Sequence, residues 1–206
     1  MLLSARMRGQ DAGPAPSSPA PEPNTAQSWE FSMAAAGYVI PHGTSYVSPT
    51  FTADRGWLHL EGRYNYENLQ TGSLWIGYNF SLADKPELKL TPLLGCVFGR
   101  ESGIAPGYLA TFNYKRIALF SQGEFVFDTQ GKAASFFYSW SEFSYAPAEW
   151  FRAGLVSQRT KAYQTPLDVQ RGFLVGFSHK KLDFTAYMFN LGWTDPTVVL
   201  SLGIRF

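Results

Sequence analysis

Most of the chain alternates between polar and apolar residues in segments of about ten residues, and this period constrains the fold more than any other feature. Alternation with a period of two is typical of β-strands, and turn-forming runs such as "ADRG", "DTQGK" and "SHKK" separate the segments. No helical period persists between them, and the longest connection, which starts at Arg159, is short. The pattern predicts a meander of hairpins. Its twelve expected strands lie near 28–40, 45–53, 57–67, 72–82, 87–98, 104–114, 116–127, 134–145, 149–158, 168–178, 181–191 and 196–206.

Alternate residues of a strand point to opposite faces of the sheet, and we call each alternate set a phase. The two phases of the expected strands differ in chemistry. One phase is apolar and includes Leu58, Leu60, Tyr64, Tyr66, Leu74, Ile76, Tyr78, Phe80, Leu182, Phe184, Met188, Val198, Leu200, Leu202, Ile204 and Phe206. The other phase is polar and includes His59, Glu61, Arg63, Asn65, Ser73, Asn79, Lys89, Thr91, Gln122, Glu124, Arg152, Asp183, Thr185, Ser201 and Arg205. Alternation alone fits two barrels: a soluble barrel with the apolar phase inside, and a membrane barrel with that phase facing lipid.

The distribution of charge favours the membrane barrel. The chain has 17 Lys and Arg and 16 Asp and Glu. Most of them fall in the expected turns, whereas a sheet that faces water carries charges along its outer face. Tyr and Trp recur near strand ends, as in "RYNY", "SYAPAEW" and "LGW", where amphipathic rings would form a girdle at lipid headgroups. We therefore expect an all-β fold, a closed antiparallel up-and-down transmembrane β-barrel, with the polar phase in the lumen.

The last strand, "TVVLSLGIRF", places apolar side chains in one phase and ends on Phe206. Together with the short hairpins and aromatic strand ends, it resembles Gram-negative outer-membrane β-barrel proteins over roughly residues 28–206. The resemblance implies insertion among outer-membrane lipids in the bacterial outer membrane. It also implies an assembly signal that the barrel-assembly machinery reads, with its candidate residues Leu200, Leu202, Ile204 and Phe206.

The beginning of the chain differs from the rest. Residues 10–27 are rich in Pro, Ala and Ser with almost no large apolar residue, so we expect a disordered leader over 1–27 before a barrel domain over 28–206. The start "MLLSARMRG" lacks the apolar stretch of a secretory signal. Either the protein is cytoplasmic, or its predicted start lies inside a signal peptide whose beginning is missing. No apolar run reaches about 18 residues, so no transmembrane helix is expected.

The lumen is the expected functional region. Its candidate lining residues are His59, Glu61, Arg63, Asn65, Lys89, Gln122, Glu124, Glu142, Arg152, Asp183 and Arg205. Acids and bases are nearly balanced among them, which predicts weak charge selectivity if the lumen conducts. Paired charges would equally suit a polar core that closes a narrow barrel. Trp75, Tyr138 and Trp140 can share this phase and either grip a solute or fill space.

Three functions follow, in order of preference: a passive channel for small polar solutes, a structural or adhesive barrel with a closed lumen, and a lipid-modifying enzyme. The candidate for the third is "PHGTSY", with His42 and Ser45, but no companion motif accompanies it. We expect no catalytic residue, no metal site and no cofactor, and the net charge of +1 gives no reason to expect nucleic acid. The sequence does not indicate an oligomeric state.

Small residues suggest one further feature. Ser121, Gly123, Ser139 and Ser141 can fall in the apolar phase and form a shallow patch among phenylalanines. Such a patch could seat a lipid chain or a second subunit, because small side chains permit close approach. Local packing is the other interpretation.

Overall fold

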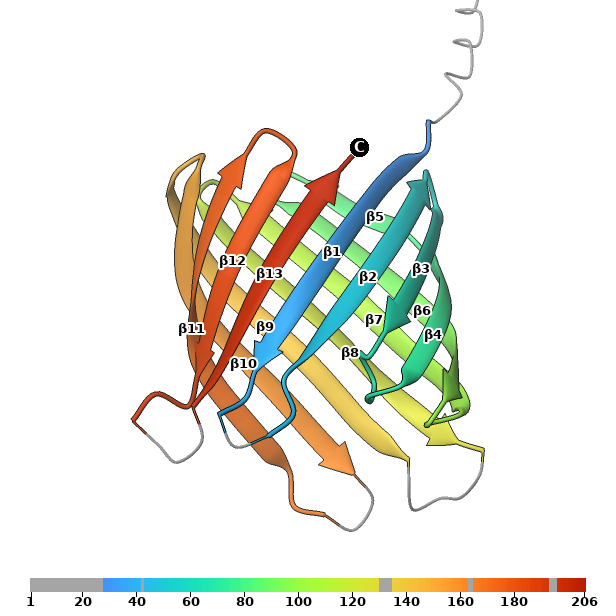
Figure 1. The fold of residues 1–206 in the computed structure, drawn as a ribbon. Coiled ribbons are helices and arrows are strands. Elements are labelled where there is room, and N and C mark those ends of the chain that lie inside the picture. Colours follow the sequence, from blue (N-terminus) through green and yellow to red (C-terminus); the bar gives the residue numbers. More distant parts are fainter. Residues whose placement is uncertain (1–27, 42, 130–134, 163–164, 193–195) are drawn as a thin grey trace, which may run out of the picture.

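The computed structural model describes residues 28–41, 43–129, 135–162, 165–192 and 196–206. The leader expected over residues 1–27 lies outside these described residues. Within the described part of the chain, no helix is long and apolar enough to cross a membrane. The described residues form strands joined by turns and loops (Figure 1).

Thirteen strand segments follow one another along the chain. They are β1 (Glu30–Val39), β2 (Tyr46–Arg55), β3 (Leu58–Tyr64), β4 (Thr71–Tyr78), β5 (Phe80–Asp84), β6 (Glu87–Gly99), β7 (Gly103–Tyr114), β8 (Ile117–Asp128), β9 (Phe136–Ala148), β10 (Phe151–Ala162), β11 (Asp168–His179), β12 (Leu182–Phe189) and β13 (Thr197–Arg205). Only Asn79 separates β4 from β5, and both pair with β6. They therefore make one barrel strand, and the twelve strands expected from the sequence are confirmed.

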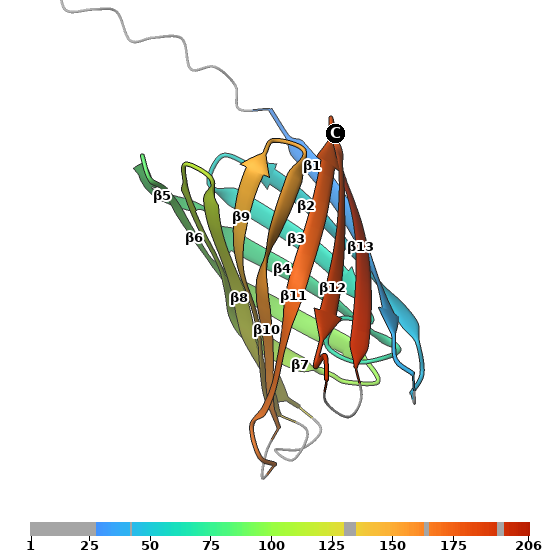
Figure 2. The ribbon, with the colours of Figure 1, turned by 90° about the vertical axis from the view of Figure 1, so that its left-hand side faces the viewer.

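The sheet closes on itself. β1 pairs antiparallel with β13, from Ser32 opposite Arg205 to Val39 opposite Val198, and β4 pairs with β6 on the other side of the ring. The strands are inclined to the barrel axis, as closure of a sheet requires (Figures 1 and 2). Because neighbours pair all around the ring, the ladders satisfy the backbone groups of the strands without water, which a lipid environment demands.

The two ends of the barrel differ. The start of β1 and the C-terminus lie at the same end, which we call the terminus end (Figure 1). Tight turns such as that between β2 and β3 also lie there. The other end, which we call the loop end, carries the longer connections, including residues 65–70 between β3 and β4 (Figures 1 and 2).

The apolar phase of the strands faces outward. Leu60 and Leu200 are 37% and 42% exposed, whereas the adjacent Glu61 and Val199 are 7% and 1% exposed. The phase predicted from the sequence is thus confirmed for β3, β4 and β13, with one exception. Tyr66 was expected to face outward as part of the third strand, but β3 ends at Tyr64 and Tyr66 lines interior cavities.

Aromatic side chains gather on the outer surface at the terminus end. Trp57 stacks on Tyr78 at 5.4 Å, Trp150 on Phe177 at 6.3 Å, and Phe31 on Phe206 at 6.3 Å between ring centroids. All of these rings except Phe31 are more than a third exposed. Aromatic residues near the end of an outward apolar band form the girdle that is typical of membrane-spanning barrels.

Candidate functional site

A buried ion cluster in the barrel interior centres on Arg63 of β3. Its Nε donates to Oε1 of Glu61 at 2.7 Å, and its Nη1 donates to Oε2 of Glu124 at 2.7 Å. Glu124 lies on β8, which three barrel strands separate from β3, so this contact spans the interior rather than joining neighbouring strands. All three residues are 7% exposed or less, and a charge can stay buried in this way because each one is paired.

The rings of Tyr66 and Trp75 contact the Arg63 guanidinium. The Cζ atom lies 4.4 Å from the ring centroid of Tyr66 and 4.5 Å from that of Trp75, which are cation–π distances. The Trp75 indole donates to Oγ of Ser73 at 2.9 Å. Gly95 on β6 makes room for it, since a Cβ there would lie 2.4 Å from the indole ring. The cluster is therefore tightly packed.

The connection between β3 and β4 folds into the loop end of the barrel. Asn65 and Gln70 adopt positive φ angles of 55° and 59°, which reverse the chain at both ends of residues 65–70. Oδ1 of Asn65 accepts the backbone N–H of Gln70 at 2.8 Å and fixes this loop. The loop sends two side chains, Tyr66 and Glu67, into the interior.

Glu67 extends the ion cluster toward the loop end. Its Oε1 accepts Oγ–H of Ser73 at 2.5 Å and lies 3.9 Å from Nη1 of Arg63. Burial raises the pKa of the Glu67 carboxyl, although the bond from Ser73 and the charge of Arg63 act in the opposite direction. Oε2 of Glu67 and Oε1 of Glu124 are buried with no hydrogen-bond partner among the described protein atoms. These oxygens can accept hydrogen bonds from water or a polar solute.

Tyr66 forms a narrow point with β8 and β9. Its ring meets that of Tyr138 edge to face at 5.5 Å between centroids, and its hydroxyl accepts the side-chain amide of Gln122. Burial raises the pKa of the Tyr66 hydroxyl well above its ordinary value, so the hydroxyl stays neutral. Two rings and an amide thus face each other where the loop enters the barrel.

A second polar network lies toward the terminus end. Nδ1 of His59 lies 2.8 Å from Oδ1 of Asp54, and Nε2 lies 3.3 Å from Oε2 of Glu61. Asn79 donates to Asp54 at 2.8 Å and accepts from Thr91 at 2.7 Å. His59 therefore links the Arg63 cluster to the terminus-end network through shared carboxylates.

The opposite wall carries two further groups of polar side chains. Oε1 of Glu142 accepts hydrogen bonds from Trp140 at 2.8 Å and from Tyr187 at 2.9 Å. Arg152 forms a bidentate pair with Asp183 at 2.6 and 2.8 Å. The interior thus holds fixed charges of both signs on several strands.

Three cavities follow one another along the barrel axis. The terminus-end cavity, about 530 Å³, is lined by His59, Lys89 and Thr91 among others. The central cavity, about 240 Å³, lies between Glu61, Gln122 and Glu142, and the loop-end cavity, about 400 Å³, reaches Glu67 and Gln158. Phe120 lines both of the first two, and Tyr66 and Tyr138 line both of the last two. The central cavity is the smallest and lies between the two aromatic boundaries.

The structure brings most of the candidate lining residues to the interior, in three groups. His59, Glu61, Arg63, Gln122, Glu124 and Glu142 belong to the central networks; Arg152 and Asp183 pair with each other; Lys89 and Arg205 line cavities at the terminus end. Asn65 was placed wrongly in the phase of a strand, since it lies beyond the end of β3. Its side chain fixes the loop and donates to the carbonyl of Val47 at 3.1 Å.

Sequence reasoning missed Tyr66 and Glu67 as interior residues. Strict alternation through Asn65 places Tyr66 in the outer phase, and Glu67, the last residue of the strand expected over 57–67, is not among the candidate lining residues. Asn tolerates positive φ better than most residues, so "YNYENLQ" carries a signal for a change of direction at that point. That signal does not say that the loop folds inward.

The candidate residues for the enzyme alternative are His42 and Ser45. His42 lies outside the described residues, and Oγ of Ser45 accepts the backbone N–H of Ile40 at 3.2 Å. Among the described residues, no group of three or more His, Cys, Asp or Glu side chains is placed to hold a metal ion.

Comparison with known proteins identifies the fold. No protein-family model matches the sequence, and no curated protein sequence matches it. Among solved structures, the chain is similar to a KdgM porin, with a TM-score of 0.62 and 9% identity, over 85% of this chain and 99% of that one. A KdgM porin in complex with disordered oligogalacturonate gives a TM-score of 0.63, also with 9% identity and the same coverage. A NanC porin gives 0.57 with 8% identity, over 84% of this chain and 98% of that one. The chain therefore has the fold of a small porin-like barrel.

Proposed function

We propose that the protein is a passive channel for small polar solutes in the bacterial outer membrane. The observation that carries this proposal is the row of three interior cavities that share walls from one end of the barrel to the other. The outward apolar phase and the aromatic girdle support insertion in lipid. The likeness in fold to KdgM and NanC porins supports the same role.

The orientation follows from the two ends of the barrel. Outer-membrane barrels have short periplasmic turns and longer extracellular loops. The terminus end is then periplasmic, and the loop end with Tyr66 and Glu67 faces the outside. A solute would enter by the loop-end cavity and meet the constriction between Tyr66 and Tyr138 before it reaches the central cavity.

The charges at the constriction indicate the class of solute. Glu61, Glu67 and Glu124 surround Arg63, whose guanidinium is already paired and stacked. An anionic chain such as the oligogalacturonate in one KdgM complex would find no free cation here and would meet carboxylates. We therefore favour neutral or weakly cationic polar solutes and weak charge selectivity with a preference for cations.

Planar-bilayer recordings on refolded protein test the proposal. We expect discrete conductance steps and, in a KCl gradient, a reversal potential that indicates weak selectivity for cations. Tyr138→Ala should raise the unitary conductance because it removes one wall of the constriction. Tyr78→Ala is the control, since Tyr78 lies on the outer surface and is 45% exposed. Equal conductance of both variants and the wild type would contradict a constriction at Tyr138.

A closed structural barrel is the second candidate, and one observation favours it. The Arg63 to Glu124 contact joins two parts of the wall that three barrel strands separate, and the central cavity has a volume of only about 240 Å³. Correctly folded protein that inserts into bilayers but carries no current would select this alternative. Neither candidate contains a catalytic step, and recognition by the barrel-assembly machinery belongs to both.

A further inference from the structure

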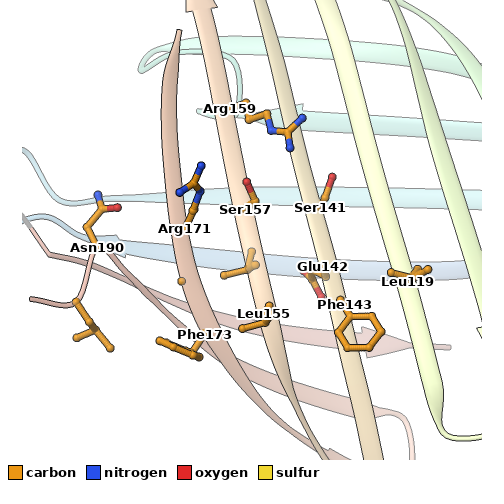
Figure 3. Close-up of a pocket in the computed structure, with 13 residues that line it drawn as sticks. Leu119, Ser141, Glu142, Phe143, Leu155, Ser157, Arg159, Arg171, Phe173 and Asn190 are labelled. Atoms are coloured by element: carbon orange, nitrogen blue, oxygen red, sulfur yellow. The ribbon is translucent and has the colours of Figure 1, made fainter. Parts of the chain in front are cut away.

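A groove lies on the outer wall of the barrel, across β8, β9, β10 and β11 (Figure 3). Its volume is about 560 Å³. Its floor is formed where small side chains meet on adjacent strands: Ser141 pairs with Ser157, and Ser121 Oγ lies 3.0 Å from Ser141 Oγ. Of the four small residues expected from the sequence to form an outer patch, Ser141 lines this groove and Ser121 contacts Ser141. Gly123 is covered by the Tyr108 ring and Ser139 is buried, so neither of these two residues lines the groove.

The groove has a cationic head and an apolar body. Arg159 and Arg171 lie toward the loop end, while Leu155, Phe143 and Phe173 lie toward the terminus end (Figure 3). Leu155, Phe143 and Phe173 are 54%, 44% and 53% exposed. A hollow that changes from charged to apolar along its length matches one amphipathic molecule rather than a flat protein surface.

The two arginines are close enough to share one anion. Ser157 pairs with Arg171 and Arg159 pairs with Val169, so the arginines are diagonal neighbours on adjacent strands. Such neighbours are about 7–8 Å apart, a separation that two guanidinium groups span around a phosphate. Both side chains are exposed, and neither forms an ion pair with a described carboxylate.

The acid beside the groove does not neutralise them. Glu142 contributes to the wall from β9, but its Oε1 accepts hydrogen bonds from Trp140 and Tyr187 inside the barrel. Asn190 borders the head of the groove and adds a neutral polar side chain near Arg171 (Figure 3). Charged side chains on the lipid face of a barrel are costly near mid-bilayer and much less so near the interfaces. The position of Arg159 and Arg171 toward the loop end is therefore consistent with the height of outer-leaflet headgroups.

We propose that this groove binds one lipid of the outer leaflet whose headgroup carries phosphate, with the phosphate between Arg159 and Arg171 and an acyl chain along Leu155 and Phe173. The inference rests on the proposed location in the outer membrane but not on conduction. Arginine pairs suit phosphate because each guanidinium can donate two parallel hydrogen bonds. The small side chains of Ser141 and Ser157 leave the depth that an acyl chain needs.

Native mass spectrometry of the full-length folded barrel tests the proposal. The protein is exchanged into micelles that contain bisphosphorylated lipid A, and the bound lipid is counted after release from the micelle. We expect one retained molecule, and R159Q/R171Q should weaken retention by about tenfold or more, because charge-assisted contacts to phosphate are lost. R116Q/K181Q removes two cations from turns at the terminus end and should retain lipid like the wild type.

Two further measurements identify the source of binding. S157F keeps both arginines but fills the groove, and it should also weaken retention of lipid A. Phosphatidylcholine should be retained less than lipid A, and inorganic phosphate alone should not remain bound, because it lacks the apolar contacts. Equal retention of lipid A by R159Q/R171Q and the wild type would overturn the proposal. A native mass spectrum that shows a dimer of the protein without bound lipid would also overturn it.

The outcome is separable from that of the channel proposal. A barrel that conducts but retains no lipid A contradicts only the lipid site. A barrel that retains lipid A and carries no current supports the lipid site and contradicts only the channel. Recovery of the folded protein as a soluble monomer without detergent would contradict both.

Discussion

Arg63 and Glu124 are 61 residues apart in the sequence, yet Nη1 of the first lies 2.7 Å from Oε2 of the second in the barrel interior. Arg63 also pairs with Glu61 at 2.7 Å, so one cation holds two buried carboxylates. The contact connects β3 to β8 through the interior, although three barrel strands lie between them in the sheet. Both proposed functions depend on this cluster, because it narrows the interior and sets its local charge.

Replacement of Arg63 by Met should destabilise the barrel by about 3–5 kcal/mol, because Glu61 and Glu124 would remain buried without their cation. Urea titration of the folded fraction in micelles measures this change. The triple variant Glu61→Gln, Arg63→Met, Glu124→Gln should recover much of the loss, since it removes the charges together. A free energy of unfolding within about 0.5 kcal/mol of the wild type for Arg63→Met would show that the cluster does not hold the barrel.

The pKa of Glu67 predicts how stability changes with pH. Burial raises this pKa above its ordinary value of 4.5 in the folded protein. The folded state then binds the proton more tightly than the unfolded state, so the stabilisation is fully present below pH 4.5 and is lost as the pH rises through the folded pKa.

Glu67→Gln should therefore flatten the decrease in stability as the pH rises above 4.5. Gln keeps an oxygen that can accept Oγ–H of Ser73 but cannot ionise. Urea titrations at pH 5 and pH 8 measure the difference. Glu149→Gln, in the turn between β9 and β10, is the control for removal of one carboxyl. An unchanged pH dependence in Glu67→Gln would mean that Glu67 does not titrate in this range.

The strands and their phase could be predicted from the sequence because both are local. A two-residue period directly gives the face of each side chain, and the expected strand 196–206 corresponds to β13, Thr197–Arg205. The concentration of charge in turns favoured lipid over water outside the barrel. The local pattern failed at Asn65, where a positive φ ends the strand before Tyr66, whose side chain lines interior cavities.

The contacts of the candidate site could not be predicted in the same way. Which inward side chains meet across the barrel depends on strand tilt and register around the whole ring, as with Arg63 and Glu124. The space for Trp75 depends on Gly95, on a neighbouring strand. The pairing of Arg159 and Arg171 on the outer wall likewise depends on the register between β10 and β11.

Phe206 joins the last strand to the first. Its N–H donates to the carbonyl of Phe31 at 3.0 Å, its carbonyl accepts the N–H of Phe31 at 3.2 Å, and the two rings stack. We expect deletion of Phe206 to reduce assembly in the outer membrane far more than deletion of residues 1–20, because it removes closure contacts as well as part of the expected assembly signal. Heat-modifiable migration of outer-membrane fractions on a gel measures assembly. Equal assembly of both truncations would contradict the role of Phe206.

Leu200 and Ser201 test which face of the barrel meets lipid. Leu200, halfway along β13, is 42% exposed on the outer surface, whereas Ser201 lines the central cavity. Leu200→Arg should cost about 2–4 kcal/mol, because it places a cation against hydrocarbon near mid-bilayer. Ser201→Arg should cost less, because its side chain faces a polar interior. Refolding into lipid vesicles under a urea gradient measures both.

The same pair separates the barrel from the channel. If the interior conducts, Ser201→Arg should shift the reversal potential toward anions, because a fixed positive charge beside the path attracts them. Ser201→Gln is the control for a larger side chain without the charge and should leave selectivity unchanged. A greater loss in the free energy of unfolding for Ser201→Arg than for Leu200→Arg would contradict the assignment of the Leu200 face to lipid and the Ser201 face to the interior. Normal refolding of wild type and Ser201→Arg with no current from either would leave the barrel intact and contradict the channel.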